Sequence, residues 1–113
     1  MKKIVLAAVA LSILSGNANA ADHYRMSGYG AEACEHGPEG QVEIGNGYFR
    51  VGETVYERAG ERRKNPDGSF TARYDLIAEG EPQGAEEATL LITGKGVVIR
   101  FADGESVTAS ACR

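Results

Sequence analysis

Alternating hydrophobic and polar positions dominate the chain, and the clearest run lies between Phe70 and Glu79. Apolar residues occupy every second position of this run, and only Ile77 breaks the alternation. A period of two is typical of a β-strand with one buried face. The run from Val97 to Ala102 alternates in the same way, and with the apolar segment Ala88 to Thr93 before it, this run predicts a hairpin.

Turn residues separate these runs from weaker strands. Glycine recurs at the corners, and the Asp-Gly pairs at 67–68 and 103–104 are typical of tight turns. The segment Glu53 to Lys64 stays ambiguous, because its apolar residues fit one face of a helix as well as a strand at Thr54 to Arg58. Weaker strands are expected at Gln41 to Gly45, Tyr48 to Val51 and Ser106 to Cys112.

The predicted fold is all-β, with six to seven short antiparallel strands. Because no covering helix is predicted, the strands must bury one face among themselves, as a small barrel or a two-layer sandwich, and we favour the barrel. Its side chains should fill the barrel and leave little room for a ligand cavity. The expected core residues are Val42, Ile44, Phe49, Val51, Tyr74, Leu76, Leu90, Ile92, Val97, Ile99, Phe101 and Val107.

The N-terminus has the features of a secretory signal peptide. Lys2 and Lys3 precede a largely apolar run from Ile4 to Leu14, and Ala18-Asn19-Ala20 follows as a small-residue cleavage site. The apolar run is about half the length that a membrane-spanning helix needs. We therefore expect residues 1–20 to be removed, leaving a single β-domain at 21–113 in the periplasm, without membrane attachment.

Charge narrows the choice of partner. The whole chain has 12 basic and 16 acidic side chains, and loss of Lys2 and Lys3 leaves 10 basic against 16 acidic, a formal charge of −6. A nucleic-acid partner is not expected at this charge. A cationic protein is the better match, because opposite net charge steers association.

The two cysteines are Cys34 and Cys112. In an oxidising compartment they can form only one intramolecular bridge, which would join the two ends of the domain. The loop from Cys34 to Cys112 contains 79 residues. For such a loop the chain-entropy model gives on the order of 4 kcal/mol of stabilisation.

Catalytic motifs are lacking, so we expect neither enzyme activity nor a cofactor. No serine lies in a Gly-x-Ser-x-Gly elbow. The two histidines, His23 and His36, lie in a glycine-rich stretch where no strand is expected to fix them. No metal site is predicted, with one alternative left open: cleavage before Ala21 would expose Ala21-Asp22-His23, whose four nitrogens could bind copper(II) or nickel(II).

Two short motifs resemble those of the periplasmic and lipid-anchored inhibitors of c-type lysozyme. Arg73-Tyr74 is followed, thirteen residues after Tyr74, by Glu87-Ala88-Thr89-Leu90, and Tyr29 lies near Cys34. The resemblance implies a small disulfide-bonded β-barrel that occludes the cleft of a basic lysozyme. It also implies a binding site at Ser69, Arg73 and Tyr74.

Two other classes of function remain open from the sequence. The overall layout also resembles small exported bacterial proteins of unassigned function. Such a protein could bind a small ligand, or copper or nickel, or have a structural role in the envelope. A cavity in the barrel would favour ligand binding, whereas a filled barrel with an exposed charged loop would favour protein binding.

Overall fold

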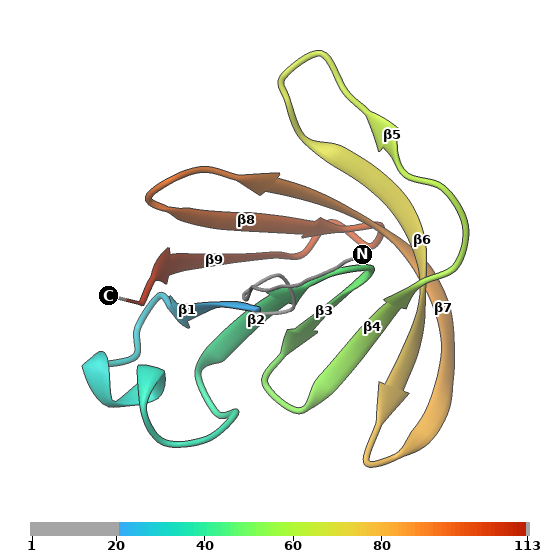
Figure 1. Cartoon of the computed structure of the whole chain (residues 1–113). Helices are drawn as coiled ribbons and strands as arrows, with labels where there is room; N and C mark the ends of the chain where they lie inside the picture. The colour runs from blue at the N-terminus through green and yellow to red at the C-terminus, as the bar shows by residue number, and fades with distance from the viewer. Residues whose placement is uncertain (1–20, 113) are drawn as a thin grey trace, which may run out of the picture.

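The chain forms a closed antiparallel barrel of eight strands (Figure 1), which confirms the barrel over the sandwich. The computed structural model describes residues 21–112, so the signal peptide predicted at 1–20 lies outside the described residues. The barrel strands are β1 (Asp22–Met26), β2 (Gln41–Gly45), β3 (Tyr48–Val51), β4 (Thr54–Arg58), β6 (Phe70–Ala78), β7 (Glu81–Ile92), β8 (Gly96–Phe101) and β9 (Ser106–Ala111).

Consecutive strands pair around the barrel, and two pairings complete the ring. The first joins β1 to β9, and the second joins β4 to the C-terminal half of β6. The N-terminal half of β6 continues beyond β4 and pairs instead with the two-residue strand β5 (Arg63–Lys64). The hairpin of β5 and β6 therefore projects from the barrel (Figure 1).

Most of the predicted strands are present. The strongest run forms β6, and the ambiguous segment contains strand β4 at Thr54–Arg58. The hairpin between β7 and β8 is confirmed, with Leu90 opposite Ile99. The alternation breaks at Ile77 for a structural reason, because the register of β6 against β7 shifts between Leu76 and Ile77.

Three features of the sheet were not predicted from the sequence pattern. Strand β7 begins at Glu81 rather than near Ala88, and β5 was not expected at all. The expectation that no strand fixes His23 was wrong: His23 lies in β1, which pairs on both sides and buries the neighbouring Tyr24 to 4% exposure. The barrel therefore has eight strands instead of the six or seven expected.

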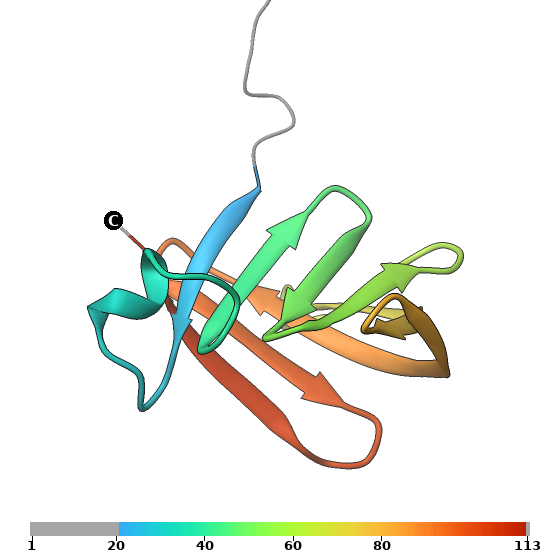
Figure 2. The ribbon, with the colours of Figure 1, turned by 90° about the horizontal axis from the view of Figure 1, so that it is seen from below.

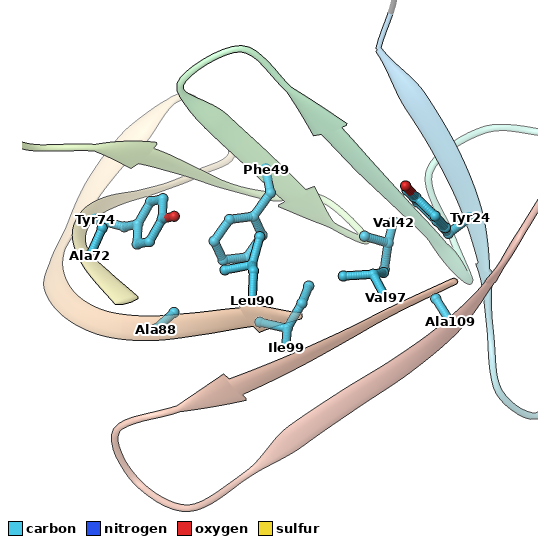
Figure 3. Close-up of a cluster of buried hydrophobic side chains, with 10 residues drawn as sticks. All are labelled: Tyr24, Val42, Phe49, Ala72, Tyr74, Ala88, Leu90, Val97, Ile99 and Ala109. Carbon is cyan, nitrogen blue, oxygen red and sulfur yellow. The ribbon is translucent and has the colours of Figure 1, made fainter. Parts of the chain in front are cut away.

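Aromatic and branched side chains fill the barrel interior (Figure 3). The ring of Phe49 stacks on Tyr56 at 4.5 Å between centroids and meets the edge of Tyr74 at 4.9 Å. Alanines complete the packing, and Ala72 and Ala88 lie opposite each other on β6 and β7. The sequence-based core omitted the alanines and wrongly included Ile92, which is 44% exposed at the end of β7.

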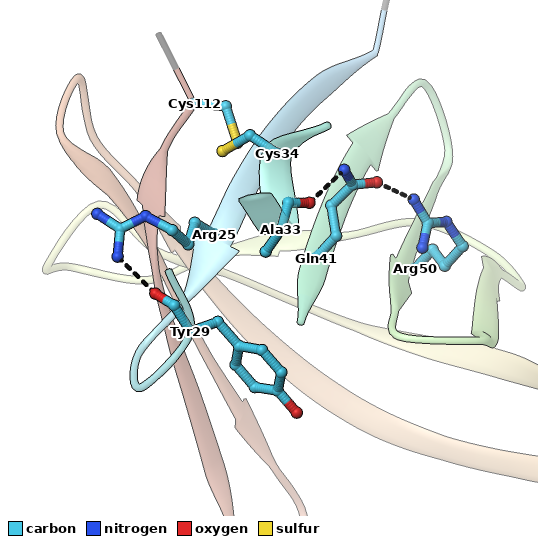
Figure 4. The surroundings of a disulfide bond; sticks show 7 residues. All are labelled: Arg25, Tyr29, Ala33, Cys34, Gln41, Arg50 and Cys112. Carbon is cyan, nitrogen blue, oxygen red and sulfur yellow. Dashed lines mark hydrogen bonds between the residues drawn. A yellow bond between two sulfur atoms is a disulfide. The ribbon is translucent and has the colours of Figure 1, made fainter. Parts of the chain in front are cut away.

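The predicted disulfide between Cys34 and Cys112 is present (Figure 4). Cys34 ends a short 3-10 helix, η2 (Ala31–Cys34), which lies beside the C-terminal end of β9 (Figure 2). The buried Gln41 amide donates to the Ala33 carbonyl at 2.9 Å and accepts from Arg50 at 2.6 Å (Figure 4). The bridge and this network together attach the segment between β1 and β2 to the barrel.

A polar cluster crosses the outer face of β1, β2 and β3, with Glu43 at its centre. The Glu43 carboxylate accepts hydrogen bonds from the Tyr48 hydroxyl and from Arg50, and lies 3.2 Å from the His23 ring. The bond from Tyr48 is the largest cause that lowers the pKa of Glu43, and Arg50 adds to it. The cluster therefore favours an ionised Glu43 in the folded protein.

No helix in the described part of the chain is both long and apolar enough to cross a membrane.

Candidate functional site

The turn of the projecting hairpin, residues 65–69, is held by its own hydrogen bonds. The Asn65 amide donates to the Ser69 carbonyl at 2.8 Å, and the Gly68 amide donates to the Asn65 carbonyl at 3.0 Å. Gly68 has a φ of +93°, which an L-residue rarely adopts. The Asn-Pro-Asp-Gly-Ser sequence thus folds locally into a closed turn.

Side chains fix the turn further. The Asp67 carboxylate accepts bonds from the Ser69 amide at 2.9 Å and from the Ser69 hydroxyl at 2.6 Å, and these bonds lower the pKa of Asp67. The Asn65 amide group donates to the hydroxyls of Ser69 at 3.0 Å and Thr71 at 2.9 Å. Thr71 in turn bonds Thr89 on β7 at 2.8 Å, so the turn is linked to the barrel wall.

The structure does not bring the three predicted site residues together on one surface. Ser69 is 1% exposed, and its hydroxyl is used inside the turn. Tyr74 is 7% exposed and points into the barrel against Phe49 (Figure 3). Arg73 alone is exposed, on the outer face of β6, since neighbouring residues of a strand point to opposite faces. Of the three, only Arg73 can contact a partner directly.

The two motifs that carry the family resemblance pair with each other across β6 and β7. Arg73 lies opposite Glu87, and Thr71 lies opposite Thr89. The Glu87 carboxylate is also 3.5 Å from the guanidinium of Arg63 on β5. On the outer face the motifs therefore contribute only Arg73, Glu87 and Thr89, because their other residues are buried in the barrel.

Charge is divided between the two ends of the barrel. The turns that follow β3, β6 and β8 share one end, and their exposed acidic residues are Glu53, Glu79, Asp103 and Glu105. Basic residues gather on β5 and β6 and on the segment before them, with Arg62 placed 4.2 Å above the Phe70 ring. The hairpin is thus the cationic part of an acidic chain.

A cleft of about 430 Å³ opens at the end of the barrel beside the hairpin. The barrel interior is filled, as expected, and this cleft lies at its open end. Residues of β2, β3, β4, the segment before β5, β6 and β7 line the cleft. Its apolar and aromatic lining residues include Ile44, Phe70, Tyr74, Leu90 and Ile92, and its polar ones include Asn46, Tyr48, Arg58, Glu61 and Arg62.

Asp22 and His23 are the first two residues of strand β1, and Ala21 directly precedes it. Asp22 and His23 lie opposite Ile44 and Glu43 in the ladder with β2, and the Cys112 amide donates to the His23 carbonyl at 3.0 Å. Chelation of copper or nickel through the amides of Asp22 and His23 would require this end of β1 to leave the sheet. Among residues 21–112, no three His, Cys, Asp or Glu side chains are grouped as metal ligands.

Comparisons with protein-family models, with curated proteins and with solved structures found no match. Function therefore has to be inferred from the geometry of the chain itself.

Proposed function

We propose that this protein is an exported, non-enzymatic inhibitor of c-type lysozyme that occludes the enzyme cleft with the β5–β6 hairpin. The observation that carries the proposal is the projecting turn at 65–69, held by hydrogen bonds of its backbone and of Asn65, Asp67 and Ser69. A segment ordered before binding loses little conformational entropy in the complex, so more of its contact energy becomes affinity.

The residues at the hairpin have separate roles in this proposal. Arg73 supplies the exposed cation, and no carboxylate of the described residues lies within ion-pairing distance of its guanidinium. Ser69 is a positioning residue that holds the turn through Asp67, and Tyr74 fixes β6 from inside the barrel. The cleft of a c-type lysozyme contains two carboxyl groups, and a guanidinium that bonds to them would exclude the sugar.

Net charge supports association between the two proteins. The chain without residues 1–20 has 10 basic and 16 acidic side chains. A basic lysozyme would be attracted by this charge over a distance of about 10 Å at 0.1 M salt. The cationic hairpin would then meet the acidic cleft once the two surfaces are close.

A lysozyme activity assay tests the proposal. The protein without residues 1–20, at micromolar concentration and low ionic strength, should inhibit a c-type lysozyme, and inhibition should weaken as salt rises. Arg73→Ala should weaken inhibition about tenfold or more, because a charge-assisted hydrogen bond is lost. Lys95→Ala is the matched control, since Lys95 is an exposed cation on the turn between β7 and β8, outside the hairpin.

Two results would contradict the proposal. Unchanged lysozyme activity at micromolar protein and low salt would exclude inhibition of this enzyme class. Inhibition that Arg73→Ala and Lys95→Ala leave equally strong would show that the hairpin surface carrying Arg73 is not the inhibitory site.

A further inference from the structure

The cleft at the barrel mouth combines apolar side chains with two guanidinium groups. Phe70 and Leu90 lie directly opposite each other on β6 and β7, and both line the cleft. Arg58 ends β4 directly opposite Tyr74 on β6. Because residues opposite each other in a ladder point to the same face of the sheet, Arg58 extends over the inner face above Tyr74. Arg62 reaches the cleft from the segment before β5.

Neither guanidinium of the cleft is neutralised within the described residues. Glu61 also lines the cleft, yet no carboxylate of residues 21–112 lies within 4.0 Å of the guanidinium nitrogens of Arg58 or Arg62. Acidic side chains outnumber basic ones in this chain by 16 to 12. Both guanidiniums are therefore available to an anion at this mouth, where Arg62 also lies 4.2 Å above the Phe70 ring.

The buried hydroxyl of Tyr74 also points to a ligand in the cleft. Tyr74 is 7% exposed and lines the cleft, and its hydroxyl makes no hydrogen bond within the part of the chain that the structure describes. Burial raises the pKa of Tyr74, while the positive charges of Arg58 and Arg62, which line the same cleft, act in the opposite direction. A buried hydrogen-bond donor without an acceptor is destabilising and is rare in folded proteins, unless a ligand or a water molecule accepts its hydrogen bond.

We propose that the cleft binds a small organic carboxylate with a short aliphatic chain. The carboxylate lies between Arg58 and Arg62 and accepts a hydrogen bond from the Tyr74 hydroxyl, while the chain packs against Phe70 and Leu90. The cleft volume of about 430 Å³ is within the usual range of small-molecule sites. This site uses the inner face of β6 and does not depend on lysozyme inhibition, which uses Arg73 on the outer face.

Calorimetric titration with three probes tests the chemistry of the ligand. Octanoate offers a carboxylate and a chain, 1-octanol offers the same chain without charge, and acetate offers the carboxylate without the chain. Octanoate should bind saturably, and the other two should bind at least about tenfold more weakly. No saturable heat with millimolar octanoate, or equal affinity for 1-octanol, would overturn the proposal.

Variants then locate the site. Arg58→Gln and Arg62→Gln should each weaken octanoate binding at least about tenfold, whereas Lys95→Gln, which removes the same charge from the turn after β7, should not change it. Tyr74→Phe should weaken binding about 2- to 12-fold, without lowering the unfolding midpoint of the free protein, because the lost hydroxyl has no partner there. Full affinity in both arginine variants would show that octanoate binds elsewhere and would overturn the assignment.

Discussion

Removal of the disulfide should destabilise the fold by a large share of its total stability. The perturbation is the double variant Cys34→Ser and Cys112→Ser. The two cysteines are 78 positions apart, and opening so long a loop should destabilise the fold by about 4 to 5 kcal/mol in the chain-entropy model. A domain of this size has a total stability of about 5 to 15 kcal/mol, so the bridge supplies a large share.

Urea unfolding at pH 7 measures this loss. With a denaturant slope of about 2 kcal/mol/M for a small domain, the midpoint of the double variant should fall by about 2 M. Wild-type protein unfolded with a reductant present is the control, and it should match the double variant. The hydrogen bonds of Gln41 to Ala33 and Arg50 do not involve the cysteines, so the folded variant should keep this network.

A midpoint shift that corresponds to less than about 1 kcal/mol would refute the loop-entropy reasoning. Reaction of the unfolded, unreduced protein with two equivalents of a thiol reagent would refute the bridge itself.

Three other substitutions test individual features of the fold. Glu79→Asn should stabilise the protein by about 1 kcal/mol, because residue 79 has a φ of +54° that asparagine adopts more readily than glutamate. A lower midpoint of thermal unfolding in the variant would contradict this. Gly96→Ala should destabilise the fold by about 1 to 3 kcal/mol, because the added Cβ would collide with the Ala109 carbonyl. Gly94→Ala is the control, since a Cβ there meets nothing within 4 Å. Equal losses of stability in the two variants would refute the clash. The pKa of Glu43 is lowered in the folded protein, so its ionised carboxylate stabilises the fold fully above the unfolded-state pKa, near 4.5, and this stabilisation is lost as pH falls through the folded-state pKa. The difference in unfolding free energy between wild type and Glu43→Gln should therefore become smaller from pH 7 to pH 3. A difference that stays constant would exclude this linkage.

The fold was predictable wherever one face of a strand is buried and the other is solvated. Strand β6 meets this condition, and the break at Ile77 coincides with its change of register. The first half of β7 has no buried face, because residues 81–87 are polar or small and largely exposed. Only its backbone pairing with β6 makes this segment a strand. Strand β1 is short, its alternation of polar and apolar residues covers only His23 to Met26, and its two neighbours in the sheet come from distant segments.

The candidate sites were less predictable, for two reasons. Ser69 follows Asp67-Gly68, and the spacing of Asp67 and Ser69 allowed a side-chain bond that buries the hydroxyl; this capping of the turn was the local signal for its structural role. The cleft gave no local signal, since Arg58, Arg62 and Tyr74 meet only when β4 pairs with β6. A long-range pairing of this kind has no counterpart in sequence periodicity.

Competition with substrate is the most direct test of lysozyme inhibition by occlusion. The measurement is the affinity of a c-type lysozyme for an oligosaccharide substrate analogue, titrated at low salt with increasing amounts of the protein lacking residues 1–20. If the hairpin occupies the cleft, the apparent affinity for the oligosaccharide should fall in proportion to bound inhibitor, and Arg73→Ala should shift this dependence to at least about tenfold higher protein concentration. A lysozyme that binds the protein and the oligosaccharide together, each with unchanged affinity, would contradict occlusion.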